Sequence, residues 1–155
     1  MSRQSAGLLV YRLQEGVLEV LLVHPGGPFW KNKDLGAWSI PKGEFVDPET
    51  PLAAARREFQ EELGLPAPDS AIDLGQVKQK AGKIVHAFAA EADLDLSAFK
   101  SNAFSMEWPP KSGRQTEFPE VDRAEYYPLA EARRKINPAQ AALLDTLEQL
   151  LAKRG

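Results

Sequence analysis

The segment from Thr50 to Gly64 constrains the fold most, because it carries both the start and the stop signals of a helix. Thr50 can supply an N-cap oxygen, and Pro51 suits the first helical position, where the missing N–H costs no helical hydrogen bond. Gly64 suits the left-handed residue that commonly follows the last helical turn. The sequence therefore predicts a helix over Pro51–Leu63.

This predicted helix combines an apolar stripe with an acidic cluster. Four residues at i, i+3, i+7 and i+11 indicate a buried face: Leu52, Ala55, Phe59 and Leu63. Glu58, Glu61 and Glu62 stand at i, i+3 and i+4, so they project together from a neighbouring face. Like charges at this spacing repel, and the C-terminal half of a helix disfavours anions. Either this is a solvated acidic face, or the three carboxylates gather a cation.

The composition indicates which cation such a cluster would hold. The chain has no cysteine and only two histidines, so a metal site would be built from oxygen ligands. Hard oxygen ligands suit Mg²⁺ or Mn²⁺ rather than zinc or copper. Mg²⁺ held by a few carboxylates keeps water positions and typically bridges to substrate phosphates.

The rest of the chain predicts an α/β/α layered domain with a mixed β-sheet, as one domain over residues 1–155. Ser5–Leu13 and Val17–Val23 flank a glycine turn and predict a β-hairpin. Further strands are expected at Ala37–Ile40, Ile72–Lys78, Lys83–Glu91 and Arg123–Tyr127. Helical segments are expected as one turn near Asp95 or Ser97, a short helix over Leu129–Lys135, and a helix capped by Asn137 that runs to about Lys153. We expect Ser101–Glu120 to be irregular, with Phe104–Trp108 as a possible strand.

The overall charge and the absence of long apolar runs limit the partners. A formal net charge of −3 provides no basic field, which disfavours long nucleic acids. The apolar run Ala6–Tyr11 is too short for a signal-peptide core or a membrane span. We therefore expect a cytoplasmic protein, monomeric or homodimeric, with a small-molecule substrate and no membrane partner.

A fixed spacing connects the helix to the residues before it. Gly43 is followed by five residues and Glu49, then by seven residues and the run Arg57–Leu65. This arrangement resembles the Nudix box without a mismatch, and a chance match is on the order of one in a million. The preceding hairpin is also similar to the Nudix fold, an α/β/α sandwich. The resemblance implies a pyrophosphohydrolase that depends on Mg²⁺ or Mn²⁺.

The resemblance also implies roles for the residues of the box. Metal ligands would be the three glutamates on the helix together with the main-chain carbonyl of Gly43, and Glu58 would be the base that deprotonates the attacking water. Arg57 and Glu49 would pair and orient the catalytic helix, which Gly64 ends. Family members often add a carboxylate from a later loop, for which we prefer Glu120 over Glu117.

Residues outside the helix offer candidate contacts to the substrate. Lys42 can reach a phosphate as a point charge, or remain a solvated loop lysine. Trp30 and Trp108 lie in predicted loops and can stack a base, or cover the edge of the core. Arg114, near Trp108, adds a positive charge for a phosphate.

The substrate class depends on a shorter resemblance. The segment Ile40–Gly43 looks like the Pro-Lys-Gly segment of dinucleoside polyphosphate hydrolases. Neither the tyrosine typical of that group nor the proline that marks the ADP-ribose group is found after the box, where Ala81-Gly82-Lys83 stand. We expect a nucleoside diphosphate linked to another moiety, first a dinucleoside polyphosphate such as diadenosine tetraphosphate, second a nucleoside triphosphate. The alternative is a non-catalytic Nudix-fold nucleotide-binding module, although such modules usually lose the glutamates that this box retains.

Overall fold

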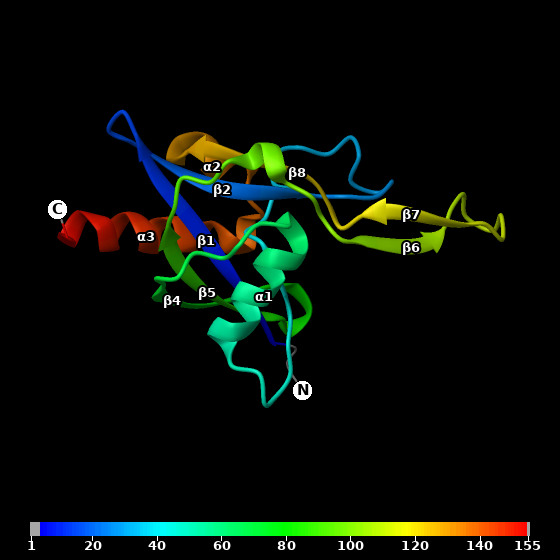
Figure 1. The fold of residues 1–155 in the computed structure, drawn as a ribbon, viewed down its shortest axis with the longest axis horizontal. Helices are drawn as coiled ribbons and strands as arrows, with labels where there is room; N and C mark the ends of the chain where they lie inside the picture. Colours follow the sequence, from blue (N-terminus) through cyan, green and yellow to red (C-terminus); the bar gives the residue numbers. More distant parts are fainter. Residues whose placement is uncertain (1–3, 155) are drawn as a thin grey trace.

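A computed structural model of the chain describes residues 4–154, and a mixed six-stranded sheet forms its centre (Figure 1). The strands are β1 (Gln4–Gln14), β2 (Val17–Pro25), β3 (Lys42–Glu44), β4 (Ile72–Lys78), β5 (Ile84–Glu91) and β8 (Val121–Pro128). Their order is β4-β5-β1-β2-β8, with β3 paired to β1. β1 and β5 run parallel, and the other pairs are antiparallel.

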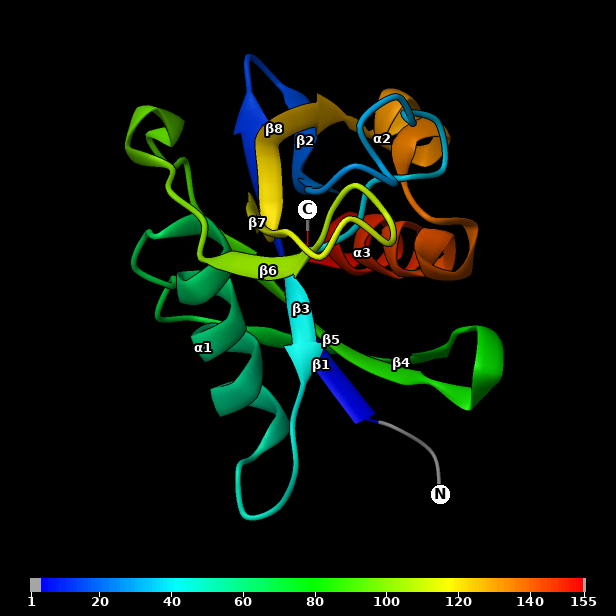
Figure 2. The same ribbon diagram turned by 90° about the vertical axis from the view of Figure 1, so that its right-hand side faces the viewer.

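Helices cover both faces of this sheet, with α1 (Pro51–Leu63) on one face and α2 (Leu129–Lys135) and α3 (Ala141–Arg154) on the other (Figure 2). The alternation of side chains along β1 supplies both cores. Leu8 and Val10 pack in the α1 core, whereas Leu9 and Tyr11 pack with α2 and α3. The predicted α/β/α sandwich with a mixed sheet is therefore confirmed. Among the described residues, no helix is long and apolar enough to cross a membrane.

Helix α1 has the predicted bounds because its signals are local. Thr50 Oγ1 accepts a hydrogen bond from the Ala53 N–H over 3.3 Å, and Pro51 stands at the first turn. Gly64 has a φ of 68° and donates its N–H to the Gln60 carbonyl over 2.8 Å. A Cβ at Gly64 would lie 2.4 Å from the carbonyl oxygen of Lys100, so this position excludes a side chain for a steric reason as well.

Three expectations about local structure are wrong. Ala37–Ile40 is not a strand, because Trp38 and Ser39 form only isolated bridges while their segment fills the core between β2 and the end of α2. Ser101–Glu120 is not irregular: it holds the hairpin of β6 (Ala103–Glu107) and β7 (Gln115–Pro119), a separate two-stranded sheet that projects from the body (Figure 1). Within it, only the strand considered at Phe104–Trp108 is confirmed, one residue earlier as β6. Leu52 is 37% exposed and lies outside the buried stripe, where Ala54 is buried instead.

Three single turns of 3₁₀ helix complete the secondary structure of residues 4–154. They are η1 (Lys80–Gly82), η2 (Leu96–Ala98) and η3 (Pro138–Gln140). The second is capped by Asp95, as expected, and the third leads into α3.

Candidate active site

The last two turns of α1 bring the three helical glutamates against β3. Glu62 is the most deeply placed of them, with 8% of its surface exposed. Its Oε2 accepts a hydrogen bond from the main-chain N–H of Lys42 over 3.0 Å. This bond joins the helix to the first residue of β3 and fixes the position of the carboxylate.

Gly43 lies directly beneath the Glu58 carboxyl group. A Cβ built on Gly43 would lie 2.0 Å from Glu58 Cδ and 2.2 and 2.3 Å from its two oxygens, well inside any allowed contact. The absence of a side chain therefore creates the space that the carboxylate fills. The main chain of Gly43 and the carboxylate of Glu58 are therefore neighbours, and a main-chain carbonyl and a carboxylate are both hard oxygen ligands.

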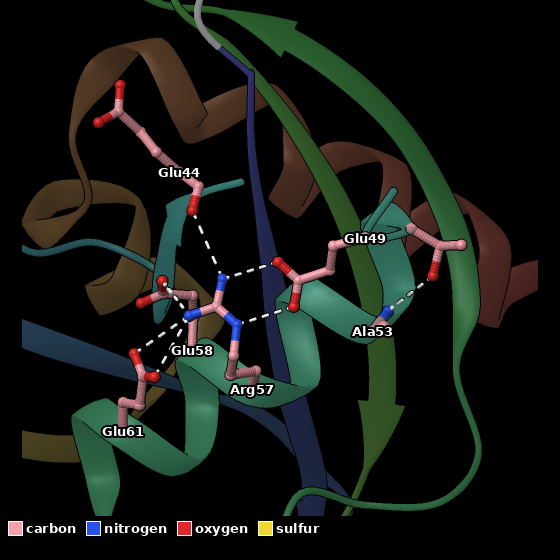
Figure 3. Close-up of polar contacts among 7 residues, drawn as sticks. Glu44, Glu49, Ala53, Arg57, Glu58 and Glu61 are labelled. Atoms are coloured by element: carbon pink, nitrogen blue, oxygen red, sulfur yellow. Dashed lines mark hydrogen bonds and ion pairs between the residues drawn. The ribbon is translucent and has the colours of Figure 1, made fainter. Parts of the chain in front are cut away.

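The guanidinium of Arg57 lies among the carboxylates of Glu49, Glu58 and Glu61 (Figure 3). Its Nε and Nη2 form a bidentate ion pair with Glu49, at 2.7 and 2.9 Å. Its Nη1 donates to Glu58 over 2.9 Å and to Glu61 over 3.3 Å. These carboxylates raise the pKa of Arg57, with Glu49 contributing most. The pairing of Arg57 with Glu49 thus links the loop before α1 to the acidic face of the helix.

A chain of main-chain hydrogen bonds brings Glu120 to the same place from the end of β7. The Asn102 N–H donates to the Glu61 carbonyl over 3.0 Å, and the Asn102 carbonyl accepts from the Glu120 N–H over 2.8 Å. The Glu120 carbonyl in turn accepts from the Gly26 N–H over 2.9 Å. Asn102, just before β6, therefore pairs with a main-chain carbonyl near the end of α1 and also positions Glu120.

Burial and mutual repulsion both disfavour the charged forms of these carboxyl groups. The pKa of Glu62 is raised to about 8, chiefly by burial, with smaller contributions from the charges of Glu58 and Glu120. The pKa values of Glu58 and Glu120 are also raised, first by burial and then by Glu61. Burial lowers the pKa of Lys42 in the same place, although the nearby glutamates oppose this effect. Clustered oxygen ligands that repel one another fit a divalent cation, which would relieve the repulsion.

The carboxylates are not yet gathered around one point. Within residues 4–154, no group of three histidine or acidic side chains has an arrangement that would hold a metal ion as it stands. Nη1 of Arg57 contacts the carboxylates of both Glu58 and Glu61. Binding of a cation by these two groups would therefore compete with the guanidinium.

A pocket of about 230 Å³ opens beside the carboxylates. Of the expected substrate contacts, Lys42 and Trp30 line it, together with two expected metal ligands, Glu62 and Glu120. Its polar wall was not predicted from the sequence and consists of Ser39, Gln79, Asn137 and Gln140. Gln140 is fully buried and accepts a hydrogen bond from the Ile40 N–H over 3.1 Å. In the sequence, Asn137-Pro138 predicts only the start of a helix. No sequence pattern predicts that this segment contacts residues a hundred positions earlier.

Two of the expected substrate contacts lie elsewhere. Trp108 lines a second pocket of about 390 Å³ that also includes Lys31. Arg114 lines neither pocket, and its main chain closes the hairpin by accepting the Trp108 N–H over 2.9 Å. Trp30 and Trp108 thus belong to different pockets.

Several solved structures share the fold of this chain. The NUDIX domain of Shewanella oneidensis NrtR, solved with ADP ribose, superposes with a TM-score of 0.69 at 17% identity, over 97% of this chain and 89% of that one. An Ap4A hydrolase from C. elegans gives 0.67 at 20% identity, over 96% and 98%. A mutT/nudix family protein from Listeria innocua gives 0.65 at 18% identity, over 98% and 95%.

These identities show a shared fold, and no curated protein matches the chain by sequence. The family model of the NUDIX domain matches residues 1–147. The chain therefore belongs to the NUDIX domain family, and with its complete box it is a hydrolase that acts on pyrophosphate bonds.

Proposed function

We propose that this hydrolase depends on Mg²⁺ or Mn²⁺ and cleaves a nucleoside diphosphate linked to another moiety. Dinucleoside polyphosphates are the first choice of substrate and nucleoside triphosphates the second. One observation carries the proposal: a single pocket is lined by two buried or half-buried charged groups of the box region, Lys42 and Glu62, by Glu120 from a distant loop, and by the ring of Trp30. Such a pocket offers separate places for the phosphates of a nucleotide, for a cation and for a nucleobase.

The residues that would hold the cation are Glu58, Glu61, Glu62 and Glu120, with the carbonyl of Gly43. When bound, divalent ions of this class polarise a phosphate oxygen, lower the pKa of bound water and neutralise the leaving phosphate. All five groups are hard oxygen ligands, and the chain has no cysteine to favour a softer metal.

The chain's own side chains would orient the substrate and move the proton. The ammonium group of Lys42 would contact a phosphate, and the Trp30 ring would stack on a base, a contact worth about 1–3 kcal/mol. Glu58, whose pKa is raised by burial, would accept a proton from the attacking water while Arg57 positions its carboxylate. We expect in-line attack of water on phosphorus without a phospho-enzyme, because phosphoryl transfer needs positioning and charge stabilisation more than covalent help.

Two lines of support favour a nucleotide substrate. The Pro41-Lys42-Gly43 segment is similar to that of dinucleoside polyphosphate hydrolases, and a C. elegans Ap4A hydrolase shares the fold. The NrtR domain binds ADP ribose, so this ligand belongs in any test of the substrate. A non-catalytic nucleotide-binding module is the competing function, against which the complete set of glutamates argues.

The deciding experiment is a panel of diadenosine tetraphosphate, ATP and ADP ribose with Mg²⁺ or Mn²⁺. Products are separated by chromatography after reaction in ¹⁸O-water, and label in a phosphate product identifies the phosphorus that is attacked. Glu61→Gln and Glu62→Gln should each reduce turnover at least about 100-fold, the scale of losing a major electrostatic group. Glu120→Gln should also reduce turnover, whereas the matched control Glu117→Gln should not. Tight binding of one ligand without cleavage of any would favour the binding module.

A further inference from the structure

The second pocket lies between the loop after β2 and the projecting β6–β7 hairpin, and the mechanism above does not use it. Its volume is about 390 Å³. Its lining, which defines the distal pocket, consists of Gly27, Pro28, Lys31, Trp108, Phe118, Pro119 and Asp122. Flat aromatic and proline surfaces make up most of this lining, with one positive and one negative side chain. Surfaces of this kind suit a planar ring that carries polar groups.

The distal pocket shares a wall with the catalytic pocket, which is the pocket of about 230 Å³ beside Glu62. In the first segment of the wall, the loop after β2, Trp30 lines the catalytic pocket and Lys31 lines the distal one. In the second, Pro119 lines the distal pocket, whereas the next residue, Glu120, lines the catalytic pocket. The two segments touch at Gly26, where a Cβ would lie 2.0 Å from the Pro119 carbonyl oxygen. The pockets are therefore neighbours, separated by a wall of two closely packed segments.

The groups around the distal pocket are held in place. The ring of Phe29 meets the Trp108 ring edge-on, with centroids 5.7 Å apart. The Trp108 carbonyl accepts a hydrogen bond from Thr116 Oγ1 over 3.1 Å, across the hairpin. Asp122 Oδ1 lies 2.7 Å from Nδ1 of His24, a fully buried side chain. A ring for stacking and a carboxylate to accept from an amino or hydroxyl group are thus positioned before any ligand binds.

The size of the catalytic pocket leaves part of the proposed substrate without a place. At about 230 Å³ it is smaller than the roughly 300–1,000 Å³ typical of pockets that enclose a drug-sized ligand. A dinucleoside polyphosphate is larger than that ligand class and has a base at each end. A phosphate chain that lies over the glutamates would bring its second nucleoside beyond the shared wall.

We propose that the distal pocket binds the second nucleobase of a dinucleoside polyphosphate, stacked on Trp108, with Lys31 near the adjoining phosphate. This inference rests on the proposed function and deepens it, because it explains a preference for two nucleosides over one. The box residues are common to substrates of either kind, so they cannot supply that preference.

The test compares two substrates that differ only in the second nucleoside, diadenosine tetraphosphate and adenosine tetraphosphate. In Trp108→Ala, the ratio of kcat/KM for the first over the second should fall about tenfold or more, the scale of one lost base–aromatic stack. Trp108→Phe should restore much of the ratio, since it keeps a ring. Trp30→Ala should lower kcat/KM for both substrates and leave the ratio near that of the unmodified protein. Leu35→Ala, an exposed residue of the same loop that lines neither pocket, is the surface control.

An unchanged ratio in Trp108→Ala, with the thermal midpoint preserved, would overturn the distal pocket as a base site and leave the proposed hydrolysis standing. Should the unmodified protein cleave neither substrate, the proposed function fails instead. The distal pocket is then tested by binding of a dinucleoside tetraphosphate with methylene-bridged phosphates against AMP. Weaker binding of the dinucleoside alone in Trp108→Ala would support the pocket, and equal losses for both ligands would overturn it.

Discussion

The main-chain N–H of Lys42 donates to Oε2 of Glu62 over 3.0 Å, and this bond places a buried carboxyl group at the junction of β3 and α1. Burial raises the pKa of Glu62 from 4.5 to about 8. A raised pKa means that the folded protein holds a proton that the unfolded chain has released. Its contribution to stability is therefore complete below pH 4.5 and is lost as the pH rises through about 8.

Replacement of Glu62 by Gln should remove this pH dependence. Gln keeps the acceptor for the Lys42 N–H but cannot ionise. The thermal midpoint of metal-free Glu62→Gln, relative to that of the unmodified protein, should therefore increase as the pH rises from 5 to 9. Thermal unfolding in a chelating buffer measures the difference in midpoint at each pH. A difference in midpoint that stays constant across this range would contradict the raised pKa of Glu62. Saturating Mg²⁺ should stabilise the unmodified protein selectively at the upper end, because the ion replaces the proton.

The guanidinium of Arg57 leads to a prediction about metal affinity. It binds Glu49 in a bidentate pair and also contacts Glu58 and Glu61, the groups proposed to hold the cation. Without the charge of Glu49, the guanidinium should engage those two carboxylates more strongly. Glu49→Gln should then raise the Mg²⁺ concentration for half-maximal activity about two- to fivefold, the scale on which a half-exposed ion pair shifts an equilibrium.

The control for this titration is Glu91→Gln, at the exposed end of β5. It removes the same charge from the protein without altering the contacts of Arg57, so its half-maximal Mg²⁺ concentration should match that of the unmodified protein. Equal midpoints in all three proteins would show that Arg57 does not compete with the cation.

How far the sequence predicts this structure depends on the range of the signals. The bounds of α1 are confirmed because the cap, the proline and the left-handed glycine act within a few residues of each end. The β1–β2 hairpin is also confirmed, since a two-residue turn and two apolar runs specify it locally. The pairing of β3 with β1, by contrast, joins segments far apart in the sequence and was not predicted.

β3 and the polar wall of the catalytic pocket depend on contacts that local sequence patterns do not predict. The strand is the polar triplet Lys42–Glu44, which pairs with β1, whereas the apolar run before it fills the core without joining the sheet. The Gln140 side chain reaches Ile40 across a hundred residues, a contact that no local pattern signals. The helical glutamates, by contrast, could be grouped from spacing alone, because one helix carries all three.

Gln140 provides a test of this long-range contact. Gln140→Leu removes the acceptor of the buried Ile40 N–H and should lower the free energy of unfolding by about 1–3 kcal/mol. Urea denaturation measures the loss, and Gln60→Leu on the exposed side of α1 makes the same replacement with an expected effect within about 0.5 kcal/mol. Similar losses in both variants would mean that the Ile40 contact does not stabilise the fold.

At Gly43, the addition of a single methyl group should reduce catalysis. A Cβ there would displace the Glu58 carboxyl group, which lies 2.0 Å away at its carbon, so Gly43→Ala should reduce kcat about 100-fold, the scale of a misplacement of roughly 1 Å. Gly16→Ala is the matched control. Its φ of 79° makes alanine costly by about 1 kcal/mol, but no atom lies within 4 Å of the new Cβ, so stability should fall while activity is retained. The clash also predicts coupling: Gly43→Ala should lower the thermal midpoint less in a Glu58→Ala background, where the methyl group has room. If the changes in thermal midpoint caused by Gly43→Ala and Glu58→Ala simply add, and Gly43→Ala has a nearly normal kcat, the close approach of Gly43 and Glu58 is refuted.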